Sequence, residues 1–405
     1  MSEDLINKNS PETGFTEAEL TFIQKHSGDD VTKLILKSAQ FKDLDVKKLA
    51  AQILSRQKAS KKLPEWASMS KLIFPPSLSI EQSSSEATAK YKSSLINGNT
   101  LIDITGGMGV DSFYLSKNFK KTHYFEQQEE VAKTAEYNFG LLSANNIEVH
   151  NADSIEGIVQ KNIQADWIYA DPARRDANKQ KVVLLSDCAP DVKFHLPELF
   201  KHAQNVLLKT SPLLDIDLAA HELKSVREVH VIGYEQECKE LLFDINETYS
   251  ADFLIKARVI NPAGEVIHKL DFTRNQERDA VIEFSEPLSY LYEPHPALLK
   301  AGAFKYLGTA FEVKKLAAHS HLYTSQNLVQ DFPGRTLEIT GICKPDAKEI
   351  RQFVKDNKAN LTVRNFPAKI DDLRKKWSLK EGGDIYLFAT TLFNQKKVVV
   401  VTKKL

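Results

Sequence analysis

The stretch from Leu101 to Ser116, LIDITGGMGVDSFYLS, places an acid before three glycines that fall within four positions. Asp103 is the acid, and Thr105, Gly107 and Gly109 follow it at every second position. The apolar residues before the glycines and the helical spacing after them predict a strand, a tight turn and a helix N-terminus. Backbone N–H groups at such a turn are expected to be free to face a ligand. The turn therefore predicts a binding site for a phosphate, a dinucleotide or another cofactor.

Three further acids stand at the ends of predicted strands. Glu126 closes the second strand, 23 residues beyond Asp103, while Asp153 lies just beyond the third strand and Asp171 closes the fourth. The C-terminal ends of parallel strands line one crevice, so the four carboxylates are expected to converge on one ligand. A carboxylate at the position of Glu126 can accept hydrogen bonds from both hydroxyls of a ribose. Acids also end strands and cap helices without binding anything, but this explains one acid more easily than four in register.

The rest of the chain supplies the sheet that this arrangement needs. From Thr100 onward, short apolar runs alternate with helical stretches, which is typical of a parallel sheet with crossover helices. We predict strands at residues 100–105, 121–126, 147–152, 166–171, 205–210 and 228–235, and antiparallel or edge strands at 239–245, 252–260 and 265–272. The predicted fold class is therefore α/β.

Different patterns flank this sheet on both sides. Residues 16–62 have apolar positions at three- and four-residue spacing and are predicted to be helical, and two prolines at 75–76 mark a boundary. Residues 331–405 combine strands and helices in a compact α+β unit, whereas residues 275–330 have a mixed pattern. We therefore expect an N-terminal helical module (1–75), the sheet domain (76–272), a small linking α+β module for which a ferredoxin-like fold is one option (273–330), and a C-terminal α+β domain (331–405).

The composition of the 405 residues excludes several classes of protein. Lys plus Arg and Asp plus Glu both number 54, so no global charge indicates a nucleic-acid or membrane partner, although a balanced total can hide a local patch. The three cysteines, Cys188, Cys238 and Cys343, have neither a metal-ligand nor a disulfide spacing, and we expect no metal. The N-terminus has no cationic start, and no apolar run approaches about 18 residues. We expect a cytoplasmic protein that is neither secreted nor membrane-spanning.

Residues 80 to 250 resemble the class I S-adenosylmethionine-dependent methyltransferases, which have a Rossmann-like sheet. The matching stretches are DITGGMG, HYFEQQEEVAKTAEYN, NADS and ADPARRD. Such enzymes bind the methionyl end of S-adenosylmethionine at the glycine turn, its ribose at the acid of the second strand and its adenine after the third strand. The resemblance implies Asp103, Thr105, Gly107 and Gly109 for the methionyl moiety, Glu126 for the ribose and Asp153 for the adenine amino group. Many members have glycine in place of Thr105, whose side chain is small enough to leave the turn intact.

The stretch YADPARRD, residues 169–176, resembles the fourth motif of these enzymes and lies beside the expected methyl sulfonium. The resemblance assigns Asp171, Pro172 and Arg174 to catalysis, and Asp171 also to the cofactor site. Methyltransferases that act on exocyclic amino groups of bases usually have Asp/Asn-Pro-Pro and an aromatic residue here, whose ring stacks on the flipped base. Ala173 and Arg174 replace the second proline and the aromatic residue, which weakens an amine acceptor without excluding it.

The sequence DPAR also resembles the fourth motif of enzymes that methylate C5 of uracil in RNA. Those enzymes need a cysteine after the fifth strand, because C5 becomes reactive only after a thiolate has added to C6. Thr210, Ser211 and Pro212 stand there, and Cys188 lies 17 residues beyond Asp171. C5 methylation is therefore disfavoured, and direct in-line transfer is expected.

Basic residues outside the crevice indicate an RNA partner, either tRNA or rRNA. Residues 355–405 contain 12 Lys or Arg against 5 Asp or Glu, interleaved with aromatic residues. Such a face is either solvated surface or a surface that binds the RNA backbone. The C-terminal part resembles the THUMP-like domain of a bacterial family of predicted methyltransferases, and EQSSSEATAKYK, YLYEPHPALLKAGAF and FPGR fit the same family. The candidate substrate-binding residues are Arg174, Arg175, Arg364, Arg374, Lys375 and Lys376, the first two of which could otherwise pair with nearby acids.

Other classes remain open at this point. An NAD-dependent oxidoreductase would share the sheet and Glu126, but its turn prefers G-x-G-x-x-G, and Ser112 stands at the third glycine here. Asp103 before the turn and the lack of an obvious hydride-site His or Tyr also argue against it. A methyltransferase for a protein or small-molecule acceptor, and a catalytically silent RNA-binding protein, are the further alternatives.

Overall fold

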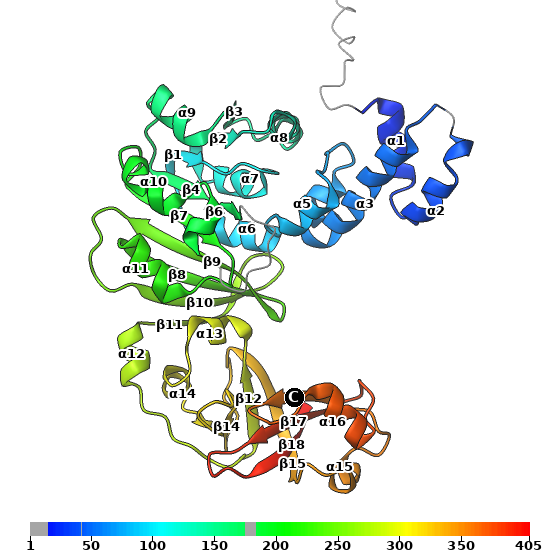
Figure 1. Ribbon diagram of the computed structural model, residues 1–405, viewed down its shortest axis with the longest axis vertical. Helices are drawn as coiled ribbons and strands as arrows, with labels where there is room; N and C mark the ends of the chain where they lie inside the picture. Colours follow the sequence, from blue (N-terminus) through cyan, green and yellow to red (C-terminus); the bar gives the residue numbers. More distant parts are fainter. Residues whose placement is uncertain (1–14, 42, 175–183) are drawn as a thin grey trace, which may run out of the picture. The chain divides into compact units, whose positions relative to one another are not determined.

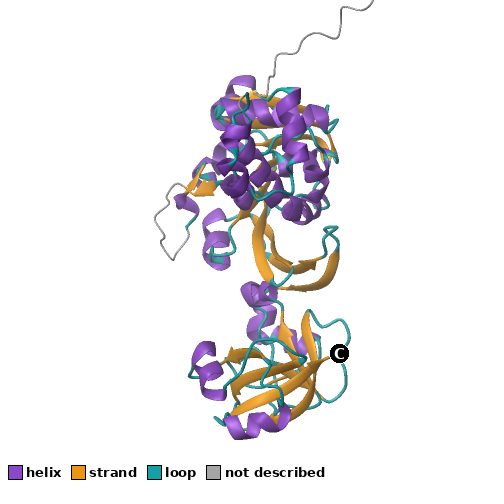
Figure 2. Ribbon diagram, turned by 90° about the vertical axis from the view of Figure 1, so that its right-hand side faces the viewer, coloured by secondary structure: helices purple, strands orange, loops and turns teal. Residues whose placement is uncertain are grey.

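The computed structural model describes residues 15–41, 43–174 and 184–405 (Figures 1 and 2). The chain divides into two compact units. Unit 1 comprises residues 1–227, 242–251 and 260–265, and unit 2 comprises residues 228–241, 252–259 and 266–405.

Helices and turns make up the described chain before residue 98. They are α1 (Glu17–Lys25), α2 (Val31–Leu36), the 3-10 helix η1 (Ser38–Gln40), α3 (Val46–Lys62), α4 (Pro64–Ser68), α5 (Ser77–Gln82) and α6 (Glu86–Ser93). Thr16, Asp30 and Asp45 precede α1, α2 and α3, and each side chain accepts a backbone N–H of the first helical turn. These bonds satisfy donors that a helix start leaves open. The predicted N-terminal helices are confirmed, while the boundary near residue 75 stays a prediction.

A nine-stranded sheet follows, with the order β11-β10-β8-β9-β7-β4-β1-β2-β3. Its strands are β1 (Gly98–Asp103), β2 (Phe119–Glu126), β3 (Ile147–Asn151), β4 (Trp167–Ala170), β7 (Asn205–Thr210), β8 (Val226–Tyr234), β9 (Glu237–Asn246), β10 (Leu254–Ile260) and β11 (Val266–Phe272). The pairs β2–β3, β1–β2, β1–β4 and β4–β7 are parallel. The carboxyl ends of these five strands therefore meet at one edge, as the α/β prediction requires.

Helices connect the parallel strands (Figure 1). They are α7 (Val110–Ser116), α8 (Glu129–Leu141), α9 (Ser154–Lys161), α10 (Val192–Leu199) and α11 (Ile216–Leu223). All four residues of β4 are buried, as expected for a central parallel strand covered on both faces. A short two-stranded sheet, β5 (Ala173–Arg174) with β6 (Cys188–Ala189), and the 3-10 helix η2 (Leu185–Asp187) lie between β4 and α10 in the chain.

Unit 2 contains a second, seven-stranded sheet with the order β13-β14-β12-β15-β18-β17-β16. Its strands are β12 (Tyr290–Pro294), β13 (Lys314–Lys315), β14 (Tyr323–Ser325), β15 (Gly334–Cys343), β16 (Asn360–Arg364), β17 (Ile385–Thr391) and β18 (Lys397–Lys404). The helices in this part are α12 (Arg274–Asp279), α13 (Pro296–Ala301), α14 (Tyr306–Ala310), α15 (Ala347–Phe353) and α16 (Ile370–Trp377). The expected boundary at residue 330 thus falls between strands of one sheet, and the domain limits stay predictions.

Candidate active site

The turn after β1 has a backbone that needs glycine for two different reasons. Gly107 and Gly109 have φ angles of 60° and 81°, which side chains rarely adopt. A Cβ on Gly106 would lie 2.6 Å from both the Phe125 carbonyl oxygen and the Tyr124 ring. The turn is therefore packed directly against the end of β2.

The N–H groups of this turn are mostly bonded within the chain. Thr105 N–H donates to Asp103 Oδ1 at 2.8 Å, and Gly107 N–H donates to Glu126 Oε2 at 2.9 Å. Gly106 N–H bonds the Phe125 carbonyl, and Gly109 N–H bonds the Gly106 carbonyl. The expectation that these groups are free to face a ligand is therefore wrong for these four positions. These four donors are therefore not available to a phosphate.

Asp103 lies beneath the turn, with only 1% of its surface exposed. It accepts hydrogen bonds from the Thr105 N–H, the Thr105 hydroxyl and the Ser112 hydroxyl. Burial raises the pKa of its carboxyl from the ordinary 3.8 to about 7, although the hydrogen bonds from Ser112 and Thr105 act in the opposite direction. Ser112, which occupies the third glycine position of a dinucleotide turn, therefore serves here to fix the acid.

Glu126 at the end of β2 uses both carboxylate oxygens to accept backbone N–H groups, one of which belongs to the turn. Oε2 accepts the Gly107 N–H, and Oε1 accepts the Gln128 N–H at 2.8 Å. A carboxylate offers about four acceptor sites, so each oxygen keeps one for a further donor. The side chain is only partly buried, and the pair of oxygens can therefore accept two adjacent hydroxyls.

Asp153 lies two residues beyond β3 and caps α9. Its Oδ1 accepts the Glu156 N–H at 3.0 Å, and its Oδ2 accepts Gln127 Nε2 at 2.6 Å. Helix capping, the non-functional role considered for such acids, is thus real for Asp153. The bond from Gln127 also holds Asp153 beside the end of β2.

Asp171 follows β4 and is paired with Lys209 near the end of β7, at 2.6 Å between Oδ2 and Nζ. Its backbone N–H donates to the Thr105 hydroxyl at 2.7 Å. Among the described residues no partner is present for Asp171 Oδ1, which is therefore open to a donor. Lys209 was not among the residues that the sequence analysis assigned to this site. A lysine as the second-last residue of the strand beside β4 was the available signal.

The remaining residues expected from the fourth motif are only partly described. Pro172 is half-buried and directly follows Asp171. The backbone of Arg174 pairs with Cys188 between β5 and β6, whereas its guanidinium lies outside the described part of the chain. Arg175 also lies outside the described residues. Their assigned roles stay predictions.

A buried network beneath the turn was not foreseen. Asp111 in the first turn of α7 accepts the hydroxyls of Ser84 and Tyr169, each at 2.6 Å. The fully buried Lys92 lies 3.1 Å from Asp111. Burial alone would raise the pKa of Asp111, but Lys92, Lys209 and the two hydroxyls hold it below its ordinary value. A charged residue on the apolar side of a predicted helix was the signal for this network.

Burial makes two of the three cysteines poor nucleophiles. Burial raises the pKa of Cys238 to about 12 and that of Cys343 to about 11. Because the thiolate is the nucleophile, these two thiols are unreactive near neutral pH. Cys188 is half-buried on β6.

The basic C-terminal residues have different environments. Lys375 and Lys376 are exposed in the last turn of α16. Arg374 in the same turn is paired with Glu381 and is less exposed. Arg364 at the end of β16 is paired with the buried Glu293. The two lysines therefore remain the best candidates for electrostatic contact with a phosphate backbone. Both arginines also form ion pairs within the chain.

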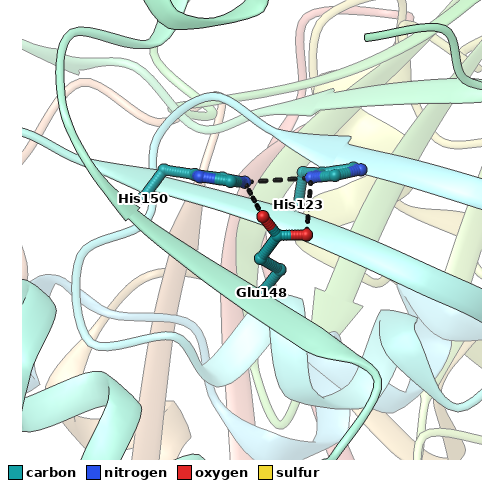
Figure 3. A group of neighbouring side chains, drawn as sticks. All are labelled: His123, Glu148 and His150. Atoms are coloured by element: carbon teal, nitrogen blue, oxygen red, sulfur yellow. Dashed lines mark hydrogen bonds and ion pairs between the residues drawn. The ribbon is translucent and has the colours of Figure 1, made fainter. Parts of the chain in front are cut away.

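Two histidines and a glutamate meet on β2 and β3, as Figure 3 shows. His123 Nδ1 lies 2.9 Å from His150 Nε2, and the Glu148 oxygens lie 3.7 Å and 3.5 Å from these nitrogens. The three side chains are close enough to hold a metal ion. Burial lowers the pKa of both histidines, that of His123 to about 4, so the imidazoles are neutral near pH 7.

Two lysines next to this cluster oppose a bound cation. Lys121 Nζ lies 2.7 Å from Glu148 Oε2, and Lys161 Nζ lies 2.9 Å from His150 Nδ1. An ammonium only donates, so His150 Nδ1 accepts and its Nε2 carries the proton that it shares with His123. A histidine that binds a metal through one ring nitrogen usually donates the N–H of its other nitrogen to an acceptor. Lys161 is a donor and cannot fill that role. We interpret the cluster as a hydrogen-bonded link between strands, and the expectation of no metal stays a prediction.

Within the described residues, no helix is both long enough and apolar enough to cross a membrane.

This fold defines an α/β protein in which the four acids lie at the carboxyl ends of parallel strands. A protein from Porphyromonas gingivalis W83, described with its crystal structure as a proposed methyltransferase, is 32% identical to the chain. The match covers 96% of this chain and 99% of that chain, with a TM-score of 0.85. Family models match residues 290–333 as a ferredoxin-like domain and residues 334–404 as a THUMP domain-like family. The chain therefore belongs to the family of the P. gingivalis protein, which confirms the resemblance to methyltransferases with a THUMP-like C-terminal domain.

Other solved structures resemble only part of the chain. An rRNA methylase from Streptococcus thermophilus is 10% identical, and the match covers 39% of this chain and 92% of that chain with a TM-score of 0.29. A proposed methyltransferase from Streptococcus mutans, solved in complex with SAH, is 13% identical over 40% of this chain and 96% of that chain, with a TM-score of 0.29. These likenesses are too low to carry an argument about function. A search of curated proteins found no match.

Proposed function

We propose that the chain is an S-adenosylmethionine-dependent methyltransferase that methylates a nucleotide in structured RNA by direct in-line transfer. The observation that carries this proposal is the series of contacts along one edge of the sheet. It joins the ends of β7, β4, β1, β2 and β3 through Lys209–Asp171, Asp171–Thr105, Thr105–Asp103, Gly107–Glu126 and Gln127–Asp153.

The residues of this edge fit the cofactor in distinct ways. Glu126 binds the two ribose hydroxyls with the acceptor sites that its oxygens keep beside Gly107 and Gln128. Asp153 accepts the adenine amino group beside its bonds to Gln127 and Glu156. Asp103 is too deeply buried to touch a ligand directly, and it acts by holding the turn that receives the methionyl end.

Asp171 is the group that meets the acceptor. S-adenosylmethionine supplies an electrophilic methyl group on its sulfonium when bound. Lys209 fixes Oδ2 of Asp171, so Oδ1 is positioned to accept a hydrogen bond from the acceptor and to receive its proton. Proximity and orientation supply most of the rate in such a transfer. Transfer without a covalent adduct agrees with the raised pKa of Cys238 and Cys343.

RNA is the proposed acceptor because of the C-terminal part. The THUMP domain-like match covers residues 334–404, and the exposed Lys375 and Lys376 lie within it. Exposed cations that contact phosphates provide affinity that does not depend on sequence. If the acceptor were a protein or a small molecule, these lysines would have no phosphate to contact.

Ligand-induced stabilisation distinguishes the cofactor classes. Thermal unfolding of the full chain with S-adenosylhomocysteine, and separately with NAD, is expected to show a higher midpoint with the first only, because a ligand stabilises the state that binds it. Stabilisation by NAD alone would replace this proposal with an oxidoreductase.

Label transfer identifies the acceptor. Methyl-labelled S-adenosylmethionine is incubated with the protein and with RNA, protein or small-molecule fractions from a strain that lacks the gene. We expect label in the RNA fraction and loss of transfer in Asp171→Asn. Label in another fraction would contradict the RNA acceptor but not the methyltransferase, whereas cofactor binding without any transfer would favour the silent RNA-binding protein.

A further inference from the structure

One carboxylate in unit 2 holds two arginines. Glu293 on β12 accepts Arg335 Nε at 2.8 Å with Oε2, and it accepts Arg364 Nη2 at 2.9 Å with Oε1. Each arginine bonds the carboxylate through Nε and Nη2. The Glu293 side chain is 6% exposed, whereas those of Arg335 and Arg364 are 36% and 38% exposed. The acid therefore lies beneath, and the two guanidinium groups reach the surface.

The outer edges of both guanidinium groups remain available. A guanidinium carries five N–H donors, and Glu293 uses two from each arginine. In the described part of the chain, neither guanidinium group makes a further hydrogen bond or ion pair. One negative charge against two positive charges leaves an excess cation. A guanidinium edge that is already held in place matches the geometry of a phosphate.

These arginines line a cavity of about 370 Å³ in unit 2. His268 and His295 share its wall, and the exposed Glu235 also contributes to it. His295 is engaged, because Nε2 bonds the Glu235 carbonyl and Nδ1 accepts the Ala297 N–H. His268 Nδ1 is buried and has no partner among the described residues. The cavity thus offers two arginine edges to a ligand.

Asn365, the residue after Arg364, lines a second cavity. Asn365 and Phe366 line a space of about 860 Å³ together with Phe284, Phe393 and other residues. The Phe284 and Phe393 rings stack at 6.2 Å with an angle of 16°, and both are exposed. Exposed aromatic rings bind single-stranded nucleic acid when cationic side chains hold its backbone, because every base can stack on a ring.

We propose that Arg335 and Arg364 form a binding site for a backbone phosphate of single-stranded RNA, and that the aromatic cavity lined by the next residue, Asn365, receives its bases. The inference rests on the proposed function, because it names the part of unit 2 that holds the RNA acceptor. Arg364 was among the residues expected to bind RNA, whereas Arg335 and Glu293 were not. The competing role is purely structural, since Arg364 links β16 to β12, two strands that are not neighbours in the sheet.

The test compares arginines of equal environment in the full chain. Arg335→Gln and Arg364→Gln are measured against Arg227→Gln, because Arg227 is 37% exposed and bonds Asp244 through Nε and Nη2 but lines neither cavity. The probe is a fluorescein-labelled ten-nucleotide RNA of mixed sequence, read by anisotropy at several salt concentrations. We expect about tenfold weaker binding in each cavity variant, and a salt slope lower by about 0.7 per arginine. The Arg227 variant is expected to bind as the unchanged chain does.

Folding is checked separately from binding. Circular dichroism and the urea midpoint show whether each variant keeps its structure. Arg364→Lys retains the charge but not the two-pronged contact, and intermediate RNA binding is expected. If the glutamine variants do not fold, Phe393→Ala on the exposed rim tests the same surface, and unchanged RNA binding in that variant would overturn the proposal.

The remaining outcomes separate this inference from the proposed function. Wild-type RNA binding in folded Arg335→Gln and Arg364→Gln overturns the site, even if the protein methylates RNA. Loss of RNA binding in these variants supports the site, even if no RNA is methylated, in which case the proposed function fails. Binding of inorganic phosphate that depends on both arginines, without any RNA binding, overturns the RNA assignment and leaves a site for a small anion.

Discussion

The hydroxyl of Thr105 accepts a hydrogen bond of 2.7 Å from the backbone N–H of Asp171, which lies 66 residues further along the chain. The same hydroxyl donates to Asp103 at 3.1 Å. One side chain thus fixes the glycine turn to the first residue beyond β4. The residue that departs from the glycine of many methyltransferases is therefore the one that connects the glycine turn to the proposed catalytic acid.

Thr105→Val removes this hydroxyl at nearly constant volume. Leaving the Asp171 N–H unpaired costs about 1–3 kcal/mol, so we expect roughly tenfold slower methyl transfer or more. S-adenosylhomocysteine affinity, measured by calorimetry, is expected to change less than the transfer rate. Thr105→Ser keeps the hydroxyl and serves as the control. Equal rates in the valine and serine variants would show that the tether is unimportant.

Glu126→Gln tests the ribose contact. A hydrogen bond to a charged group contributes about 1.5–3 kcal/mol, so the affinity for S-adenosylhomocysteine is expected to fall by about one to two orders of magnitude. Calorimetry measures the change. Glu129→Gln is a matched control, because Glu129 is an exposed glutamate nearby that pairs only with Lys133 on the same helix among the described residues. A similar effect in both variants would contradict the assignment.

Asp103 makes the free energy of unfolding depend on pH. Burial raises the pKa of its carboxyl to about 7 in the folded chain, from an ordinary value of 3.8. The folded state therefore holds more protons between these values, and the stability contributed by this group is lost as pH rises through about 7. The loss is at most about 4 kcal/mol. Urea unfolding between pH 4 and 8 should show a steeper decline in the unchanged chain than in Asp103→Asn, and parallel curves would refute this.

Replacing all three cysteines tests the absence of a covalent adduct. Cys188→Ser, Cys238→Ala and Cys343→Ala combined are expected to retain most of the methyl transfer, because the pKa values of Cys238 and Cys343 are raised by burial and nothing places Cys188 as a nucleophile. Circular dichroism checks that the combined variant keeps its fold. A denaturation-resistant complex with RNA that contains a 5-fluoropyrimidine would instead demonstrate a covalent intermediate.

The lysines of α16 test the electrostatic contact with RNA. Lys375→Glu combined with Lys376→Glu is expected to weaken RNA binding and to flatten its dependence on salt, because fewer counterions are released. Arg374 is left unchanged because it pairs with Glu381. The control is Lys47→Glu combined with Lys61→Glu, two exposed lysines of α3. Equal losses in both double variants would mean that only net charge matters.

Much of the sheet, and of the edge that carries the four acids, was predictable from sequence. The alternation of apolar runs with helical stretches predicts β1 to β4 and β7 to within two residues at each end, because both periods are local properties of the chain. Placing Asp103, Glu126, Asp153 and Asp171 at one edge needed only the rule that parallel strands end together. Gly107 and Gly109 were identifiable as turn residues because only their backbone freedom permits the positive φ.

The partners of these residues were decided by tertiary structure. Lys209 pairs with Asp171 across 38 residues, and Arg364 pairs with Glu293 across 71. Whether the N–H groups of the turn are bonded or free also depended on Glu126 and Phe125. These residues reach the turn only because β2 lies beside β1. A hydrogen bond forms between groups that strand order and register bring within about 3 Å. Local periodicity carries no information on which distant strand will be the neighbour, so such pairs emerge only in the folded chain.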